Sequence, residues 1–258
     1  MIIWACHEEA LQAFITGRKD PSALCVPISH IMGNLKRLSV STMILVLLGS
    51  AVVLLFAWRA QPQLKKTGKP SPELRDGDIV FQYSGSAQCP AIAQATHSPY
   101  SHCGIVFIEK GDPIVWEAIG PVQKTPYSEW VAHGEKHHVV VKRLKDPSPL
   151  SVAHIAAMKA EGEKEMGRPY DIWFDMDEER IYCSELVWKI YQRGARLEVG
   201  KLERFGDMDF SGSEAKRILK DRFGTRFPAK QVVITPVSIF RSPLLYTADS
   251  IATPPAIP

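Results

Sequence analysis

The sequence predicts a single α+β domain that follows one hydrophobic segment near the N-terminus. Three observations carry this prediction: β-rich stretches between residues 78 and 144, helical periodicity between residues 150 and 222, and an uncharged apolar run ahead of both. Strands and helices within about 170 residues, with no internal repeat, are typical of an α+β domain. The chain of 258 residues is long enough for one sizeable domain or two small ones.

Composition and charge argue against several classes of protein. Hydrophobic residues make up 45% of the chain and charged residues 23%, a globular balance that excludes wholesale disorder. The formal net charge of +3 is too small for a nucleic-acid-binding protein, in which basic residues cluster. The 5 cysteines lack the paired spacing of a zinc site, and no glycine-rich phosphate loop is present. We therefore expect no nucleic-acid partner, no bound metal and no cofactor.

Residues 38–58 predict a signal sequence or a transmembrane anchor. No charged residue lies between Arg37 and Arg59, and a helix of about 20 residues spans a bilayer core. From Met32 onward, a basic stretch followed by an apolar stretch has the pattern of an export signal. A buried core helix is the alternative, although soluble helices rarely go so long without a charge. No clear cleavage site follows, so a cleaved signal and an uncleaved anchor both stay open.

The regions on either side of this segment complete the predicted domain organisation. Residues 1–37 form an N-terminal extension, which we interpret as a misplaced translation start. Residues 59–74 are rich in Pro and Lys and predict a linker. Positive charges lie on both sides of the apolar run, so they do not decide its orientation in a membrane. We expect the folded domain to span 75–241 and an irregular tail to follow over 242–258.

The strands are predicted from β-rich stretches bounded by turn residues. A Gly-Asp pair at 111–112 separates two of these stretches and indicates a β-hairpin. The expected strands cover residues 78–83, 102–109, 113–119, 137–144 and 231–236.

The helices are predicted from apolar periodicity and from residues that end a helix. Residues 180–194 give the clearest pattern, because their apolar residues share one face and Gly194 follows as a stop. Pro90 is compatible with the first turn of a short Ala-rich helix. The expected helices cover residues 87–96, 150–166, 180–194 and 212–222.

Cys183 is a candidate nucleophile because it lies at the start of the clearest predicted helix. Unpaired backbone N–H groups and the helix dipole favour a thiolate at this position. The same N–H groups can donate to an oxyanion, and the backbone N–H of Cys183 is the natural candidate. A small buried cysteine on the apolar face of the helix is the alternative interpretation.

His102 and Glu117 are the candidate partners of this thiol. His102 opens a predicted strand, where its imidazole can project into a cleft, and Glu117 is an acid in an apolar strand that requires a partner. A two-residue turn at 111–112 pairs Glu117 with Val106. The two candidates then share a face but lie about four residues apart along the strand, too far for a direct hydrogen bond. A twist, a bulge or another loop length would have to close that gap. A solvent-facing position on an edge strand is the alternative for Glu117.

Four sequence blocks follow one another in an order that is informative about family. They are HSPYSHCGIV, VWEAIGPV, MGRPYDIWF and YCSELVWKIYQ. Together they resemble the YiiX family of permuted papain-like amidases, which are relatives of the NlpC-type cell-wall peptidases. The order here is His, acid and then Cys, as in the permuted arrangement. The resemblance covers roughly residues 74–242 and implies a papain-like, circularly permuted NlpC-type fold with an antiparallel sheet packed on helices.

The resemblance also implies an activity. It makes Cys183 the nucleophile, His102 the general base and Glu117 the residue that orients the imidazole. It implies a thiol hydrolase of the amidase or endopeptidase type, which acts through an acyl-enzyme on an amide or ester derived from a peptide, peptidoglycan or a lipid. Family members typically carry export signals, which implies an exported or membrane-anchored enzyme in the bacterial periplasm or cell envelope. A lipid-directed amidase or acyltransferase of the same fold, and a non-catalytic envelope binding module, are the alternatives.

Several residues beside the candidate triad are possible contributors to the cleft or to an oxyanion site, with ordinary packing as the alternative for each. They are Tyr100, Tyr170, Asp171 and Tyr182. Strand alternation directs Cys103 to the face opposite His102, where we expect it to be a packed small hydrophobic residue. Pairing of Cys103 with Cys89 in an oxidising compartment stays open.

Overall fold

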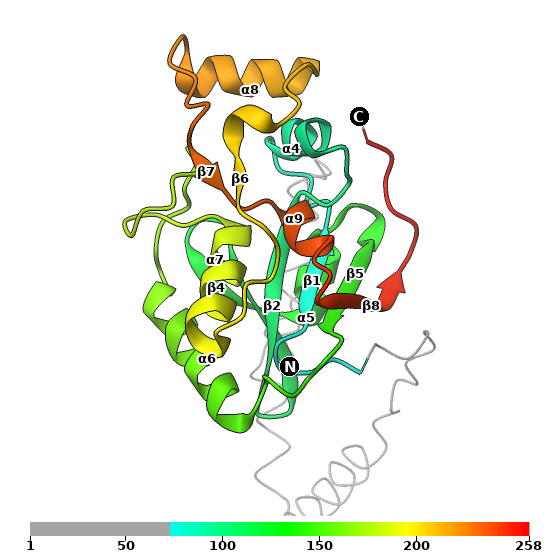
Figure 1. Cartoon of the computed structure of the whole chain (residues 1–258). Coiled ribbons are helices and arrows are strands. Elements are labelled where there is room, and N and C mark those ends of the chain that lie inside the picture. The colour runs from blue at the N-terminus through cyan, green and yellow to red at the C-terminus, as the bar shows by residue number, and fades with distance from the viewer. Residues whose placement is uncertain (1–72, 258) are drawn as a thin grey trace, which may run out of the picture. The chain divides into compact units, whose positions relative to one another are not determined.

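A six-stranded antiparallel sheet forms the centre of the structure, a computed structural model that describes residues 73–257 (Figure 1). The strand order is β4-β3-β2-β1-β5-β8, so the hairpin of β2 and β3 lies inside the sheet. The strands of this sheet are β1 (Ile79–Gln82), β2 (His102–Glu109), β3 (Asp112–Ala118), β4 (Val122–Pro126), β5 (Val139–Leu144) and β8 (Leu245–Ile251). A two-stranded sheet is formed by β6 (Glu203–Arg204) and β7 (Val232–Val233).

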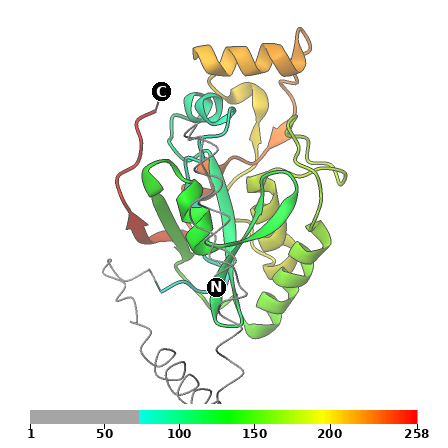
Figure 2. The same cartoon turned by 180° about the vertical axis from the view of Figure 1, so that it is seen from behind.

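Helices cover both faces of the central sheet. Two helices, α6 and α7, pack on one face and α5 packs on the opposite face (Figure 1; Figure 2). Helix α8 packs against α4 beyond the end of the sheet (Figure 1). The helices are α4 (Cys89–Thr96), α5 (Tyr127–His133), α6 (Val152–Glu165), α7 (Cys183–Ile190), α8 (Ser213–Phe223) and α9 (Pro236–Phe240). Shorter turns are η1 (Glu135–His137), the π-helical η2 (Tyr191–Ala195) and η3 (Phe205–Asp207).

The core is divided by the sheet because side chains alternate between its two faces. In β2, Ile105 and Phe107 belong to the larger cluster, which also contains the apolar residues of α7. Val106 faces the other way and joins a smaller cluster with Trp130 of α5. The side on which a β2 residue points therefore decides which helix it meets.

The larger cluster depends on a close approach between α6 and η2. A Cβ atom placed on Gly194 would lie 2.5 Å from the Cα atom of Met158, a distance that real contacts do not reach. Gly194 was expected to end the helix, but the π-helical turn continues to Ala195 and the left-handed residue is Arg196 (φ 58°). The glycine therefore serves packing between helices rather than termination.

The β2–β3 hairpin differs from its prediction by one residue, and the difference shapes the site. Glu109 pairs with Asp112, so the turn consists of Lys110 and Gly111, both with positive φ, rather than of residues 111–112. Val106 consequently faces Val115 instead of Glu117. The shift moves the acid of β3 two residues closer to the start of β2.

The other predicted elements are mostly confirmed, and the C-terminal part is corrected. The expected irregular tail over 242–258 is wrong for Leu245–Ile251, because these residues form β8 and pair with β5. An edge strand is stabilised by backbone hydrogen bonds, which a search for apolar periodicity does not detect. The stretch 231–236 contains only the two-residue strand β7, and β4 and α5 were not expected at all.

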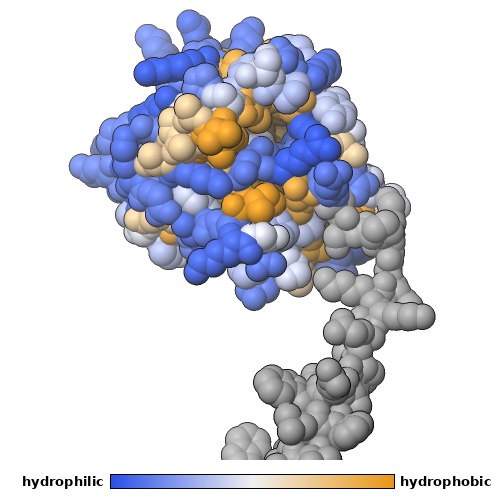
Figure 3. Space-filling view, turned by 90° about the horizontal axis from the view of Figure 1, so that it is seen from below, coloured by the Kyte–Doolittle hydropathy of each residue, from blue (hydrophilic) through white to orange (hydrophobic). Residues whose placement is uncertain are grey.

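The predictions for the N-terminal part concern residues that the structure does not describe. The extension 1–37, the hydrophobic segment 38–58 and all but the last two residues of the linker 59–74 lie outside the described range. Within residues 73–257, no helix is long and apolar enough to cross a membrane. The face of the domain in Figure 3 is mostly hydrophilic, with small hydrophobic patches between polar side chains, as is normal for a globular surface.

Candidate active site

Cys183 is the first residue of α7, and its neighbours hold the start of that helix in place. The backbone N–H of Tyr182 donates to Oε2 of Glu185 at 3.3 Å, which caps the helix. The Tyr182 hydroxyl accepts from the backbone N–H of Ile234 at 3.0 Å, and the Ser184 hydroxyl donates to the Ile234 carbonyl at 2.8 Å. Both residues beside Cys183 are therefore tied to the same distant segment. This arrangement holds the Cys183 thiol at a fixed position, where it lines a cavity.

His102 and Glu117 form a buried pair. His102 Nε2 lies 2.6 Å from Glu117 Oε2, and the two side chains are 6% and 1% exposed. The same carboxylate accepts from Trp130 Nε1 at 2.8 Å and from the Thr125 hydroxyl at 2.6 Å. Burial raises the pKa of Glu117, but the bonds from His102, Thr125 and Trp130 outweigh it and lower the pKa overall. The Glu117 carboxylate is thus ionised and held in place, with hydrogen-bond partners for both of its oxygens.

The thiol and the imidazole stabilise each other as an ion pair. Burial lowers the pKa of His102, yet hydrogen bonds with Cys183 and Glu117 raise it to about 10. The pKa of Cys183 falls well below its usual range, because hydrogen bonds from Cys103 and His102 outweigh the opposing effect of burial. A thiolate beside an imidazolium is the arrangement that activates a cysteine nucleophile.

Cys103 contributes directly to this environment. Its side chain is fully buried in the same cluster as Cys183, on the face of β2 opposite His102, as strand alternation predicted. It is nevertheless more than a packed hydrophobic residue, since its thiol and its backbone N–H both lower the pKa of Cys183. Cys89 is a separate free thiol that lies 3.1 Å from the hydroxyls of Ser84 and Ser86, so no disulfide joins it to Cys103.

Of the four flanking candidates, Tyr170 and Tyr182 line the same cavity as Cys183. Burial and the nearby Cys183 thiolate raise the pKa of the Tyr170 hydroxyl, which keeps it protonated as a donor. Tyr100 instead stacks on Phe240, with ring centroids 4.1 Å apart. Asp171 accepts from the backbone N–H of Trp173 at 2.9 Å and thereby shapes the loop before α7. Tyr182 anchors Ile234, as described above.

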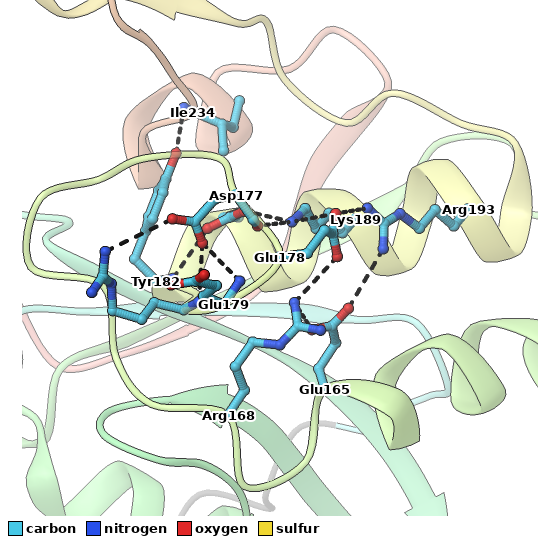
Figure 4. A network of polar contacts seen from close by, with 11 residues as sticks. Glu165, Arg168, Asp177, Glu178, Glu179, Tyr182, Lys189, Arg193 and Ile234 are labelled. Carbon is cyan, nitrogen blue, oxygen red and sulfur yellow. Dashed lines mark hydrogen bonds and ion pairs between the residues drawn. The ribbon is translucent and has the colours of Figure 1, made fainter.

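A network of charged side chains holds the loop before α7 against that helix (Figure 4). Lys189 lies 2.7 Å from Glu185 and 3.1 Å from Glu178, and Arg193 lies 2.6 Å from Glu178. Burial raises the pKa of Glu185 to about 7, although Lys189 opposes the shift. These contacts stabilise the loop between Tyr170 and Cys183, and none of the four charged residues lines the cavities beside Cys183 and His102.

One cavity adjoins the Cys183 thiol, and a second adjoins His102. The first is almost wholly apolar and is lined by Cys183 together with residues of α4 and α8 such as Ile92 and Leu219. The second is more polar and is lined by His102 and serines of the β1–α4 loop. Four residues line both cavities and so mark their boundary: Gln88, Ser101, Tyr170 and Arg222.

Sequence reasoning missed several of these residues. Thr125 and Trp130 belong to β4 and α5, which carry no clear periodic pattern, and Gln88 and Arg222 come from distant parts of the chain. The demand that a buried acid have partners pointed toward Glu117, but it did not identify the donors.

Comparison with known proteins agrees with this geometry. The model of the family described as permuted papain-like amidase enzyme, YaeF/YiiX, C92 family matches residues 73–248. The YiiX protein of Escherichia coli strain K12 is 40% identical over 192 residues, which are 74% of this chain and 87% of the relative. The crystal structure of YiiX from Escherichia coli O157:H7, described as a metalloprotein, has a TM-score of 0.64 and 40% identity. The match covers 67% of this chain and 95% of that chain. This chain belongs to the permuted papain-like amidase family of YaeF and YiiX.

Proposed function

We propose that this member of the family is a thiol hydrolase in which Cys183 is the nucleophile, His102 the general base and Glu117 the residue that orients His102. The observation that carries the proposal is the position of His102, which bonds to Glu117 at 2.6 Å and also to the Cys183 sulfur. A nucleophile, a base and an orienting acid in contact are the requirement for this chemistry. The intact set also argues against a non-catalytic binding module.

The reaction follows from these contacts. The Cys183 thiolate attacks the carbonyl carbon of an amide or ester, and the oxyanion accepts hydrogen bonds from the backbone N–H of Cys183 and from the Tyr170 hydroxyl. With its Nε2 held by Glu117, His102 gives its proton from Nδ1 to the leaving amine or alcohol, and an acyl-enzyme forms. Neutral His102 then takes a proton from water, which attacks the thioester and releases the acid. The thiolate and the imidazolium are restored.

These steps use no metal ion. The solved relative from Escherichia coli O157:H7 is described as a metalloprotein. Across residues 73–257, however, no three side chains of the His, Cys, Asp or Glu type are grouped so that they could hold a metal ion. Protein zinc sites use three or four such ligands. The described residues do not fit a metal site.

The apolar cavity supports a second candidate, in which the substrate carries an acyl chain. A chain that entered this cavity would lie beside the sulfur of Cys183 and between α4 and α8. Each buried methylene stabilises binding by about 0.8 kcal/mol, or up to about fourfold in affinity. The more polar cavity beside His102 would suit a peptide or peptidoglycan fragment. The lipid-directed and peptide-directed activities therefore differ in which cavity they require.

The two candidates are separated by assaying peptidoglycan fragments and p-nitrophenyl esters of increasing chain length side by side. For the acyl-chain substrate, kcat/KM should rise from acetate to decanoate, and Ile218→Asn in the apolar cavity should flatten this rise. Lys216→Asn, an exposed change on the same helix, is the matched control. In either case Cys183→Ala should abolish hydrolysis, and full activity of that variant would refute the proposed nucleophile.

We also propose that residues 38–58 export or anchor the enzyme, which would place the domain in the cell envelope. Fractionation of cells that express the chain with and without residues 1–58 tests this proposal. Recovery of both forms in the cytoplasmic fraction would contradict it.

A further inference from the structure

Gln88 lies at the boundary of the two cavities and joins Tyr170 to Arg222. Its Nε2 donates to the Tyr170 hydroxyl oxygen at 2.8 Å, and its Oε1 accepts from Arg222 Nη2 at 2.9 Å. Gln88 immediately precedes α4, yet its side chain makes no capping bond to that helix. Its amide is used entirely for contacts with residues far along the chain.

The direction of these bonds is determined by the chemistry of their ends. A guanidinium has only donors, so the amide oxygen of Gln88 must face Arg222 and the amide NH2 must face Tyr170. The Tyr170 oxygen therefore accepts a bond, and its single hydrogen is free to point elsewhere. Tyr170 and Cys183 line the same apolar cavity, and the Cys183 thiolate, which can only accept, contributes to the raised pKa of the Tyr170 hydroxyl. The bonds from Arg222 through Gln88 to Tyr170 thus run in one direction, toward Cys183.

Contacts with a nearby loop hold Arg222 in position to donate to the Gln88 amide oxygen. Its Nη1 donates to the Ile172 carbonyl at 2.6 Å, and its guanidinium lies over the Phe174 ring at 5.3 Å. Within the described part of the chain it forms no ion pair with a carboxylate. A charged donor strengthens the hydrogen bond it makes and polarises the next one in a chain. The two loop contacts hold this donor beside Gln88.

We propose that Gln88, fixed by Arg222, is a positioning residue that makes the Tyr170 hydroxyl a hydrogen-bond donor to Cys183 and to the oxyanion formed there. This inference rests on the proposed role of Cys183 as nucleophile. It adds the requirement that Gln88 donate to the Tyr170 oxygen, because only then does the Tyr170 hydrogen point toward Cys183.

The variant Gln88→Glu tests the direction of the hydrogen bond to Tyr170 without changing the shape of the side chain. The carboxylate keeps the size of the side chain and its contact with Arg222, but it can only accept, so the Tyr170 hydrogen should turn toward it and away from Cys183. With p-nitrophenyl butyrate as probe, we expect kcat to fall about 10- to 100-fold with little change in KM, since loss of one oxyanion donor costs up to about 10²–10³. Iodoacetamide labelling of Cys183, followed by mass spectrometry, should shift to higher pH by about one unit. Tyr170→Phe should give the same two changes.

Two controls distinguish this role from simple packing. Gln94→Glu changes a glutamine within α4 whose Oε1 also joins α8, by accepting from the backbone N–H groups of Glu214 and Ala215. That variant should leave kcat and the labelling profile unchanged. In a Tyr170→Phe background, Gln88→Glu should have no further effect on kcat, because the hydroxyl through which Gln88 acts is gone.

Three results would overturn the inference. They are a normal kcat and labelling profile in a folded Gln88→Glu variant, equal losses in the Gln88→Glu and Gln94→Glu variants, and additive losses in the Tyr170→Phe background. If Gln88→Glu unfolds, Tyr170→Phe decides through the pH profile of Cys183 labelling. Activity retained in Cys183→Ala would instead refute the proposed nucleophile, so the two failures are distinguishable.

Discussion

Replacing Glu117 with Gln tests how much the buried carboxylate contributes to the reactivity of Cys183. The change keeps the shape of the side chain and removes one charge from a site that is 1% exposed. The carboxylate oxygen lies 2.6 Å from His102 Nε2, which places the charge centres about 4 Å apart. At an effective dielectric constant of about 20, the lost attraction is about 4 kcal/mol, or roughly three factors of ten. We expect kcat/KM to fall about 10²–10³-fold, because relaxation of the site recovers part of this energy.

The assay is hydrolysis of a p-nitrophenyl ester between pH 5 and pH 10, with thermal unfolding measured on the same samples. The amide can still bond to Trp130 or Thr125, so the fold should survive, and the pKa of His102 should move down toward its usual value. Glu109→Gln, at the other end of the same hairpin, is the control and should leave activity unchanged. A folded Glu117→Gln variant with less than a threefold loss at neutral pH would refute the electrostatic role.

Three further predictions concern Cys103, the pH dependence of hydrolysis and Gly194. Cys103→Ala removes a donor to the Cys183 thiolate, so labelling of Cys183 by iodoacetamide should shift to higher pH by about one unit, whereas Cys103→Ser should restore it. In the unmodified protein, ester hydrolysis should appear as pH rises through the lowered pKa of Cys183 and should decline as His102 loses its proton near pH 10. Gly194→Ala should lower the free energy of unfolding by about 1–3 kcal/mol, since its Cβ would meet the backbone of Met158, while activity below the melting temperature persists.

Each of these predictions has a result that contradicts it. Cys89→Ala is the control for Cys103, because it removes a buried thiol that does not bond to Cys183, and an equal shift in both variants would point to a general packing effect. Labelling of Cys183 that falls away below about pH 8 in the unmodified protein, as for a free thiol, would rule out the ion pair. An unchanged melting temperature for Gly194→Ala would mean that η2 and α6 can separate at no cost.

The prediction of the hairpin illustrates what sequence reasoning can reach. Two β-rich stretches around a Gly identified β2 and β3, and alternation correctly placed His102 and Glu117 on one face. The predicted turn was wrong by one residue, because Lys110 and Gly111 form the turn with positive φ, whereas Asp112 belongs to β3 and pairs with Glu109. That single shift reduces the offset between the two candidates from four residues to two, within the reach of a diagonal pair.

The start of α7 likewise separates what the sequence predicts about Cys183 from what it does not. Apolar periodicity located the helix that begins at Cys183, and a helix start is a local property that neighbouring residues decide. Strand alternation predicted the face of β2 on which the Cys103 side chain lies, but not its role as a donor to Cys183. That this face meets Cys183 depends on how α7 packs against β2, which no local pattern records.

The sequence by itself determined the α+β class, most strands and helices, and the family, since each depends on short-range patterns or on blocks in a fixed order. Only the tertiary structure decided which side chains meet. Trp130 and Thr125 complete the site of Glu117 from elements without periodicity, and Gln88 meets Arg222 across 134 positions of the chain. The physical reason is that hydrogen-bond partners are chosen by packing and burial, which bring together groups whose separation along the chain carries no signal.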